Sequence, residues 1–537
     1  ADRLIVETRE DMIESTIRLE FAMLDVLERS ELNGSTKINA NIAYKYLKGE
    51  YGLSEELLSK VVSVCDDSDL IYYDKDTKYL ARQDTYLAEC QIANFIQDKL
   101  DNSIKLDIDY TKYTNVYGFQ LTEMQGLALK NFCESNVSIV SGVSGSGKTS
   151  SVKSLVKLME DNKLSYCLLS PTGSASLRLT TQTSRKASTI HRKVLKEKEI
   201  NCDVILVDEM SMVGIDVFLM LIQAITNKNC RVVLCGDSSQ IPSISKGTIF
   251  HDMIVSNKIP MVMLLQVFRY NTSGGSFVGE NIRQGRRFLD NEIIKEKNNV
   301  YTIYGNYKFI QSHNDDIFDN VLTEYGRLSK KYKLSDIIIL SPFNKGTCGT
   351  RALNRAIEDE YNPAQPNEKV MSYTIEGDEV IFRVNSRVVN IKNNYKALTL
   401  DSWQMIEDSD GLLTVDDVPL SQLFNGEIGT VRSIDDKKMV VQFDEQMIVF
   451  TKANIYNLLL ARAISTHRSQ GGEWSAVINI VSSIHEKMLS KNLLYVSNTR
   501  GKEFHCDIGD RETFETALLV DTVADRDTFL KELLVNE

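Results

Sequence analysis

The sequence contains no hydrophobic run that approaches the roughly 18 apolar residues needed to span a membrane. Its opening, ADRLIVETRED, has neither a basic start nor an apolar stretch, which argues against a signal peptide. The nine cysteines show no CxxC, CxH or paired spacing, and this argues against a zinc site and favours reduced thiols. Internal repeats and low-complexity tracts are also missing. We therefore expect a cytoplasmic protein that makes no membrane contact.

An excess of positive charge is missing as well. The chain has 62 Lys and Arg residues against 74 Asp and Glu residues, a net charge of −12. The acidity is concentrated in residues 1–110, with 13 basic and 23 acidic side chains, and the remainder holds 49 and 51. Because a nearly neutral region can carry a basic groove on one face, the composition leaves nucleic-acid binding open.

The length of 537 residues predicts several domains, because single hydrophobic cores stop growing near roughly 250–300 residues. At the front, residues 10–31 have helical spacing, and two further helices are interrupted near Gly49 and Gly52. The run LIYYDKDTKYLA then predicts a β-hairpin. Helices followed by a hairpin resemble a winged-helix module over residues 1–110, whose acidity favours packing or partner docking over DNA binding. Residues 85–100 predict a linking helix.

From about residue 134 the pattern changes to short β-branched runs separated by helices, as in NVSIVSG, SYCLLSPT, DVILVDE and CRVVLCGD. This alternation is typical of a parallel sheet with helical crossovers. A second set begins near residue 336 with DIIILSP and resumes at 476 with AVINIVSS. Between them, residues 380–450 are rich in short strands and turns, which predicts a small inserted β-barrel.

The segment GVSGSGKT, residues 142–149, matches the phosphate-binding pattern GxxxxGK[ST] and lies between an apolar run and a helical segment. Glycines let main-chain N–H groups turn inward around phosphates, Lys148 reaches the β and γ oxygens, and Thr149 offers a hydroxyl to Mg²⁺. We therefore expect ATP and Mg²⁺ as ligands. The expected nucleotide-binding residues of this segment are Gly142, Gly145, Ser146, Gly147, Lys148, Thr149 and Ser150.

Two further strands end in polar groups that suit phosphoryl transfer. VILVDEMSMV ends in Asp208 and Glu209, where Asp208 is placed to hold the metal and Glu209 to polarise the attacking water. LCGDSSQIPS carries Asp237 and Gln240, with Gln240 as a candidate sensor of the γ-phosphate. Such strand ends also occur as plain solvated turns, but their distance from the phosphate-binding loop favours the catalytic interpretation.

Taken in order, these motifs resemble those of superfamily 1 helicases of the RecD-like (1B) branch, over roughly residues 120–505. LTEMQ resembles the adenine-reading Q motif through Gln125, and SPTGSASLRL and ASTIHR resemble motifs Ia and Ib. LLQVFRY resembles motif IV, with Phe268 stacking on adenine and Arg269 contacting phosphate. ILSPFNKGTCGTRALN resembles a RecD-family segment, STHRSQGGEW resembles motif V, and LLYVSNTRG resembles motif VI with Arg500.

The resemblance implies an α/β fold of two RecA-like parallel-sheet P-loop domains in tandem. The first would occupy residues 111–270, with a short 1B segment at about 192–202, and the second would occupy 271–537. An SH3-like β-barrel would be inserted at about 380–450. Arg269 and Arg500 would reach across to the γ-phosphate, so Arg500 would act as an arginine finger from the same chain.

The sequence departs from the family in three places. Asn498 stands before Thr499 where relatives carry a small apolar residue, Gly501 replaces the common alanine, and Tyr270 follows Arg269 where relatives carry glutamine. The segment RKVLKEKEINC at 192–202 is also too short for the usual strand-splitting hairpin, and it could be a solvated extension of a helix. Translocation is therefore a safer expectation than duplex unwinding.

The resemblance also assigns a surface that follows a single nucleic-acid strand. Its contacts would come from hydroxyls, amides and a few cations, as is usual for strand-tracking proteins. Each histidine in this set, taken alone, would more often be a structural residue. The expected strand-facing residues are Pro171, Thr172, Ser174, Thr189 and His191 in the first domain, Thr466, His467, Ser469 and Gln470 in the second, and Asn393 in the barrel.

The implied function is an ATP-driven translocase and helicase that acts on single-stranded DNA and tailed duplexes, and the family implies travel from 5′ to 3′. Two alternatives remain at this point. The same motor could act on RNA, since most expected contacts are to phosphates. The protein could also be a nucleotide-switched subunit that docks a protein partner through its acidic N-terminal module.

Overall fold

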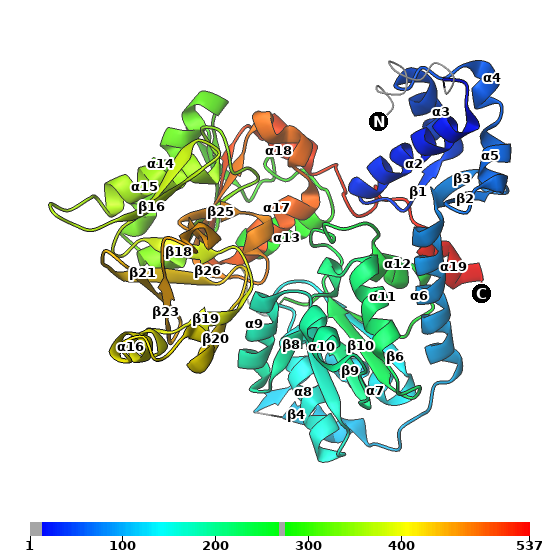
Figure 1. Cartoon of the computed structure of the whole chain (residues 1–537), viewed down its shortest axis with the longest axis horizontal. Helices are drawn as coiled ribbons and strands as arrows, with labels where there is room; N and C mark the ends of the chain where they lie inside the picture. Colours follow the sequence, from blue (N-terminus) through cyan, green and yellow to red (C-terminus); the bar gives the residue numbers. More distant parts are fainter. Residues whose placement is uncertain (1–12, 117, 268–273, 537) are drawn as a thin grey trace. The chain divides into compact units, whose positions relative to one another are not determined.

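The computed structural model describes residues 13–116, 118–267 and 274–536. The chain forms two compact units (Figure 1). Unit 1 comprises Ala1–Pro171, Leu179–Gln266 and Thr522–Glu537, and unit 2 comprises Thr172–Arg178 and Val267–Asp521. Within the described ranges, no helix combines the length and the apolarity that crossing a membrane requires.

The front of unit 1 is a bundle of short helices with a three-stranded antiparallel sheet of order β1-β3-β2. Ser15 caps the first helix by accepting from Ile17 N at 3.2 Å, and Leu19 and Met23 bury its inner face. The strand β1 is an addition to the predicted hairpin. The elements are α2 (Thr16–Leu32), β1 (Lys37–Asn39), α3 (Ala40–Gly49), α4 (Glu55–Leu58), α5 (Val61–Asp67), β2 (Ile71–Asp74), β3 (Tyr79–Arg82) and α6 (Gln83–Asp101).

The core of unit 1 is a six-stranded parallel sheet of order β11-β6-β10-β9-β7-β8. Every residue of β6, β9 and β10 is buried, because helices cover both faces and form two hydrophobic clusters. The prediction of a parallel sheet here is confirmed. Its strands are β6 (Val137–Gly142), β7 (Tyr166–Ser170), β8 (Ala187–Thr189), β9 (Val204–Val207), β10 (Arg231–Gly236) and β11 (Met261–Leu264).

Crossover helices join these strands, as the alternating pattern predicted. Thr122 caps the helix that precedes β6, and Thr189 caps the helix after β8 by accepting from Arg192 N at 3.2 Å. A two-residue pair, β4 (Asn115–Val116) with β5 (Phe119–Gln120), precedes them. The helices are α7 (Glu123–Glu134), α8 (Lys148–Asp161), α9 (Gly173–Thr183), α10 (Ile190–Glu197), α11 (Ile215–Ala224) and α12 (Ile249–Ser256).

Unit 2 contains a second sheet, of order β12-β13-β14-β27-β26-β15-β25. The five strands from β14 to β25 are parallel, and β12 and β13 extend one edge in antiparallel fashion. Two RecA-like parallel sheets therefore lie in tandem along the chain. The strands are β12 (Lys295–Lys297), β13 (Val300–Ile303), β14 (Tyr307–Gln311), β15 (Ile337–Ser341), β25 (Ala463–Ser465), β26 (Trp474–Val481) and β27 (Gly501–Gly509), with helices α13 (Gly274–Arg283), α14 (Asn314–Ser329), α15 (Thr350–Tyr361), α17 (Lys491–Arg500) and α18 (Arg511–Ala517).

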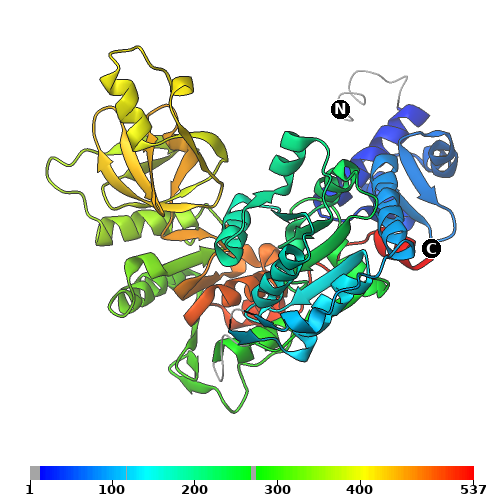
Figure 2. The same ribbon diagram turned by 90° about the horizontal axis from the view of Figure 1, so that it is seen from below.

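A β-rich insert stands between β15 and β25 of this sheet, and Figure 2 shows its yellow strands set apart from the orange strands of the sheet. One hydrophobic cluster runs through it from Met371 to Leu458, and its largest sheet is antiparallel, with order β23-β22-β21-β18-β24. The elements are β16 (Met371–Ile375), β17 (Asp378–Phe382), β18 (Arg387–Asn390), β19 (Asn394–Leu398), α16 (Leu400–Asp408), β20 (Leu420–Leu423), β21 (Ile428–Ile434), β22 (Met439–Phe443), β23 (Gln446–Phe450) and β24 (Leu458–Leu460).

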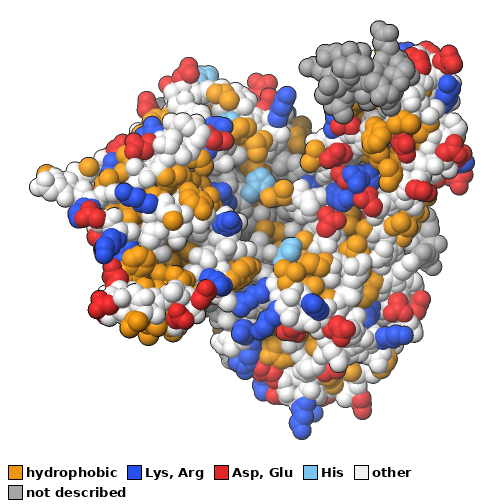
Figure 3. Space-filling view, viewed as in Figure 1, with side chains coloured by type: hydrophobic (Ala, Val, Ile, Leu, Met, Phe, Trp, Pro, Cys, Tyr) orange, Lys and Arg blue, Asp and Glu red, His pale blue; other side chains and the backbone are white. Residues whose placement is uncertain are grey.

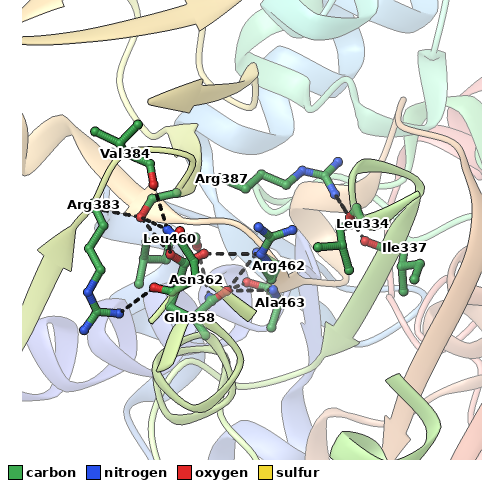
Figure 4. A network of polar contacts seen from close by, with 12 residues as sticks. Leu334, Ile337, Glu358, Asn362, Arg383, Val384, Arg387, Leu460, Arg462 and Ala463 are labelled. Carbon is green, nitrogen blue, oxygen red and sulfur yellow. Dashed lines mark hydrogen bonds and ion pairs between the residues drawn. The ribbon is translucent and has the colours of Figure 1, made fainter. Parts of the chain in front are cut away.

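A buried polar network joins the insert to the second sheet (Figure 4). Glu358 of α15 accepts from Arg462 Nε at 3.2 Å and from Ser386 Oγ at 2.7 Å. Arg387 Nη1 donates to Ile337 O at 3.1 Å, and burial, aided by the neighbouring Arg462, lowers the pKa of Arg387 to about 10. The network ties the insert to α15 and β15, and removal of either Glu358 or Arg462 would leave a buried charge unpaired.

The C-terminal segment returns to unit 1 from Thr522 onward. Its helix α19 (Leu530–Asn536) packs against α6 and α12. The Glu89 side chain accepts hydrogen bonds from Phe529 N at 3.4 Å and from Leu530 N at 3.3 Å. Burial raises the pKa of Glu89 to about 8. No local pattern in the sequence predicts this return.

Candidate nucleotide site and nucleic-acid interface

The glycine-rich loop of unit 1 connects β6 to α8, as the motif requires. Gly145 and Gly147 have φ of +78° and +82°, a backbone region that disfavours other residues. A Cβ added to Gly142 would lie 2.6 Å from Ser146 Oγ and 2.7 Å from Leu264 Cβ. These three positions therefore need glycine, and the turn leaves main-chain amides at the start of α8 available for phosphate oxygens.

Lys148 and Thr149 are the first two residues of α8. The Lys148 ammonium donates to the carbonyls of Gly142 and Val143, the latter at 3.3 Å, so it lies over the loop where phosphates would bind. Thr149 Oγ1 donates to Gln182 Oε1 at 3.4 Å. Gln182, near the end of α9, was not among the predicted residues, because neither periodicity nor a motif marks this glutamine.

The carboxyl ends of β9 and β6 meet at the same edge of the sheet. Leu234 of β10 pairs with Val207 of β9 and with Ile139 of β6, so the residues that follow each strand lie together. Asp208 N donates to Leu169 O at 2.9 Å. Glu209 has φ of +55°, a strained conformation that often marks functional positions.

The buried Cys235 thiol lies close to two charged side chains at this edge, Asp208 and Lys148. Burial raises the pKa of the Cys235 thiol well above its usual range, the Asp208 carboxylate raises it further, and the Lys148 ammonium lowers it. Since Cys235 is the penultimate residue of β10, both charges lie close to the end of that strand. The predicted metal ligand and the predicted phosphate ligand are thus brought together.

Asp237 and Gln240 follow β10 in a tight turn. Ser239 N donates to Asp237 Oδ1 at 3.1 Å, and Gln240 N donates to Asp237 O at 3.2 Å. The Gln240 side chain is buried, and its Oε1 has no hydrogen-bond partner among the described residues. Buried polar atoms are normally paired, so this amide is poised for a ligand atom.

Gln125 is placed differently from the role that the resemblance implied. It is 4% exposed; its Oε1 accepts from Thr122 N at 2.9 Å, and its Nε2 donates to Ser146 O at 3.3 Å and Gly147 O at 3.2 Å. Both amide hydrogens are thus used on the phosphate-binding loop. In this structure Gln125 supports the loop, and its contact with adenine stays a prediction.

These residues fit a nucleoside triphosphate with Mg²⁺. The glycine cradle, the amino end of the 14-residue helix α8 and the Lys148 ammonium suit an anionic phosphate chain. Thr149 and Asp208 supply the hydroxyl and carboxylate oxygens that Mg²⁺ prefers. Ser146 Oγ, buried in the loop, has no partner among the described residues, which leaves it free to contact a phosphate.

Arg500 is the last residue of α17 in unit 2 and is 3% exposed. Its Nε donates to Val496 O at 3.1 Å and its Nη1 to Gly472 O at 3.3 Å. The guanidinium therefore lies beside the motif V loop. Phe268 and Arg269 of motif IV lie outside the described residues.

Asn498, the residue at which motif VI departs from the family pattern, packs closely against Gly279 of α13. A Cβ added to Gly279 of α13 would lie 2.9 Å from Asn498 Oδ1, so α13 and α17 approach closely at this point. A glycine within a helix was the available signal for such an approach, but only the fold shows which residue it faces.

The strand-facing candidates of the first motor segment are placed around α9 and α10. Thr172 Oγ1 lies 3.3 Å from Ser174 Oγ, and Pro171, Thr172 and Ser174 are all half-buried. Thr189 is buried and uses its hydroxyl to cap α10, whereas His191 is exposed. Thr189 is thus a helix cap in this structure, and its contact with a strand stays a prediction.

Residues 192–202 fold as the end of α10 and a connecting loop, and the described residues there form no hairpin. Next to them is a recess of about 230 Å³. Figure 3 shows Lys and Arg side chains gathered over the place where Figure 1 labels α9. The recess has a surplus of positive charge; its ionisable lining residues are Lys186, Arg192, Lys193, Lys196 and Glu197.

In unit 2, the motif V loop follows β25. Thr466 and Ser469 are fully buried, and Ser469 Oγ donates to Thr466 O at 2.6 Å. Burial lowers the pKa of His467, which favours its neutral form, and Gln470 Nε2 is buried with no partner among the described residues. Thr466 and Ser469 therefore shape the loop, and His467 and Gln470 are better placed to meet a ligand.

Two loops of the insert are neighbours. Asn393 Oδ1 accepts from Asn425 N at 2.8 Å, and Asn390 Nδ2 donates to Phe424 O at 2.7 Å. The segments NIKNNY (390–395) and FNGEIG (424–429) thus form one corner of the insert, which the Asn393 side chain holds together. The contact of Asn393 with a nucleic-acid strand stays a prediction.

Comparison with known proteins identifies two matching domain families. The family described as AAA domain matches residues 120–303, and the UvrD-like helicase C-terminal domain matches residues 460–503. The ATP-dependent RecD2 DNA helicase of Deinococcus radiodurans is 26% identical over 413 residues, covering 74% of this chain and 50% of that protein. This chain therefore spans about half the length of that relative.

The RecBCD enzyme subunit RecD of Haemophilus influenzae is 22% identical over 543 aligned positions, covering 88% of this chain and 81% of the subunit. Among solved structures, Bacteroides Pif1 bound to ssDNA aligns with a TM-score of 0.44 at 18% identity, covering 76% of this chain and 96% of that chain. In its ordered motifs and its sequence relatives, this chain is similar to the RecD-like superfamily 1B helicases.

Proposed function

We propose that this protein is an ATP-driven motor that moves along single-stranded DNA from 5′ to 3′ and separates tailed duplexes. The observation that carries the proposal is the meeting of the phosphate-binding loop, Asp208, Glu209 and Gln240 at one edge of the first sheet. The RecD2 relative, named as a DNA helicase, supports the choice of DNA as substrate. Replication, recombination or repair would be the setting.

In the proposed reaction, the loop amides and the Lys148 ammonium would hold the β and γ phosphates of ATP. Thr149 and Asp208 would hold Mg²⁺, which neutralises charge on the phosphate oxygens when bound. Glu209 would orient the attacking water and accept its proton. The Gln240 side chain would contact the γ-phosphate by donating a hydrogen bond from its amide nitrogen. The fixed main chain around Glu209 suits a base that must point at one water.

Arg500 would complete the site by bridging phosphate oxygens as charge spreads over the transferring group. Its place in a motif VI sequence supports this assignment. As the resemblance implies, Phe268 would stack on adenine and Arg269 would contact phosphate. Coupling of hydrolysis to strand movement would follow from binding and release of ATP.

The strand itself would be held mainly through its phosphates and sugars. The proposed contacts are half-buried or exposed polar groups on α9, α10, the motif V loop and the corner of the insert. These are Pro171, Thr172, Ser174, His191, His467, Gln470 and Asn393, with Thr189, Thr466 and Ser469 shaping the loops that carry them.

The proposal extends to the modules around the motor. Residues 1–110 would be a winged-helix-like module that docks a protein partner, supported by the order of its helices and its three-stranded sheet. Residues 111–270 and 271–537 would be the two motor domains, and the insert would be an SH3-like barrel lying over the strand. The antiparallel order of its five-stranded sheet supports that assignment.

Steady-state ATP hydrolysis, measured with and without a DNA or an RNA oligonucleotide, tests the proposal. We expect DNA to stimulate hydrolysis and Lys148→Ala to abolish it, because the mutant lacks the ammonium that pairs with the phosphates. Stimulation by RNA alone would make the protein an RNA motor. A slow rate that no nucleic acid changes would instead identify a nucleotide-switched docking subunit.

A further inference from the structure

An exposed phenylalanine in unit 2 rests flat on a buried histidine. The Phe343 and His485 rings have centroids 4.5 Å apart and planes 9° apart. Phe343 is 38% exposed, whereas His485 is 5% exposed. One face of the Phe343 ring is therefore supported by the protein. Among the described residues, no second aromatic ring stacks on this phenylalanine.

The loop that carries Phe343 is held rigidly. Phe343 N donates to Ser341 Oγ at 3.3 Å, and Phe343 O accepts from Thr350 N at 3.0 Å. Ser341 Oγ in turn donates to Cys348 O at 2.9 Å. A Cβ added to Gly349 would lie 2.3 Å from Lys345 O, so the turn is also too tight for a larger residue. The ring is thus held in place before any ligand binds.

The histidine beneath it is equally fixed. His485 N donates to Ser482 O at 2.9 Å, and Ser482 Oγ donates to Asn314 Oδ1 at 2.8 Å, which anchors the turn to α14. Burial lowers the pKa of His485, so the imidazole supports the phenylalanine as a neutral ring. His485 Nδ1 has no hydrogen-bond partner among the described residues; packing, rather than a bond to this nitrogen, holds the ring.

This pair lies at the edge of the sheet that carries motif V. Ser341 ends β15 and pairs with Ser465, which ends β25, so the loops that follow these two parallel strands are adjacent. Thr466 N also donates to Ser341 O at 3.3 Å. The supported ring is therefore a near neighbour of the loop to which the proposed function assigns strand contacts.

We propose that Phe343, supported by His485, is a stacking platform for one base of the bound DNA strand. The proposal rests on the proposed function and adds to it a contact to a base, whereas the contacts proposed above are to phosphates and sugars. An aromatic ring that is rigid, open on one face and supported on the other suits a nucleobase, and stacking tolerates any base. In this pair Phe343 is the binding residue and His485 is a positioning residue.

The test is a fluorescence anisotropy titration with two labelled strands of equal length, an oligothymidylate and an abasic sugar-phosphate strand. We expect Phe343→Ala to weaken oligothymidylate binding roughly fivefold to a hundredfold, the range for loss of one stacked base. Binding of the abasic strand should not change, because it has no base to stack. The salt dependence should also be unchanged, since the same phosphates are neutralised.

Two further variants separate stacking from folding. Phe343→Trp should retain or strengthen oligothymidylate binding and quench a 2-aminopurine placed in the strand. His485→Ala should weaken binding in the same sense as Phe343→Ala, and His485→Phe should restore it by supplying another flat support. Tyr304→Ala is the matched control, because Tyr304 is 66% exposed in the same unit but follows β13, towards the opposite end of the sheet.

Equal affinities of Phe343→Ala and the parent for oligothymidylate would overturn the proposal. An equal loss on the abasic strand would also overturn it, because the effect would then be on phosphate contacts or on folding. These outcomes leave the proposed motor function intact. If the parent itself binds neither strand, the proposed function fails and the platform fails with it.

Discussion

Gln125 offers a sharp test of how the nucleotide site is built. The structure uses both of its amide hydrogens on the carbonyls of Ser146 and Gly147, whereas the Q-motif resemblance assigns the same amide to adenine. If the amide supports the loop, Gln125→Ala should weaken the binding of every nucleoside triphosphate. If it reads adenine, the substitution should affect ATP and spare GTP.

The size of the effect follows from the bonds lost. Each neutral hydrogen bond contributes about 0.5–1.5 kcal/mol, so the two bonds to the loop are worth about 1–3 kcal/mol together. Because the loop must recover its shape to bind phosphate, this free energy is lost from the binding free energy. Each loss of about 1.4 kcal/mol raises the dissociation constant tenfold. We therefore expect ATP and GTP binding to weaken by the same factor, roughly fivefold to a hundredfold.

Gln125→Glu is the matched comparison. A glutamate at this position keeps the capping box, because its carboxylate still accepts from Thr122 N. It cannot donate to the loop carbonyls and would repel them. It should therefore weaken nucleotide binding at least as much as Gln125→Ala while preserving helix α7.

The assay is a titration with fluorescent ATP and GTP analogues, with thermal unfolding measured alongside. The reasoning is refuted if Gln125→Ala weakens only the ATP analogue, or if Gln125→Glu binds both analogues like the parent.

Three further predictions concern hydrolysis, DNA binding and stability. Arg500→Lys should bind nucleotide like the parent but hydrolyse it at least roughly 10³-fold more slowly, because an ammonium cannot bridge two phosphate oxygens; a parental rate in a steady-state assay would contradict its role. Glu209→Gln should stop turnover and keep ATP-dependent DNA binding, measured by filter binding, and loss of that binding would argue against Glu209 as the base. The pKa of Glu89 is raised by burial from 4.5 to about 8, so the folded protein holds this proton more tightly than the unfolded chain, and stability should fall as pH rises from about 4.5 to 8. Glu89→Gln should flatten this dependence in melting temperatures taken at several pH values, and an unchanged slope would refute the assignment.

Local sequence patterns predicted the features that depend on neighbouring residues. The β-branched runs before Gly142 and Asp208 indicated buried parallel strands, because such residues suit a sheet covered on both faces. The glycine spacing of residues 142–149 specified the phosphate-binding loop, since positive φ at Gly145 and Gly147 is a local requirement. The insert was recognisable for the same reason, from short strands between turns.

Other features depend on residues far apart in the chain, and no local pattern announces them. Glu358 and Arg462 are 104 positions apart, and Glu89 meets Leu530 across 441 positions. Buried polar and charged groups of this kind are stable only with partners, and those partners come from distant segments, so a single sequence segment does not reveal them. The orientation of Gln125 belongs to the same class, because its two acceptors lie on a loop more than 20 residues away.

The central claim is that ATP hydrolysis drives this protein along DNA from 5′ to 3′. The most direct measurement is strand displacement with ATP on two matched duplexes, one with a 5′ tail and one with a 3′ tail, with hydrolysis followed in parallel. The account predicts displacement of the 5′-tailed duplex and DNA-stimulated hydrolysis on both. Displacement of the 3′-tailed duplex alone would contradict it.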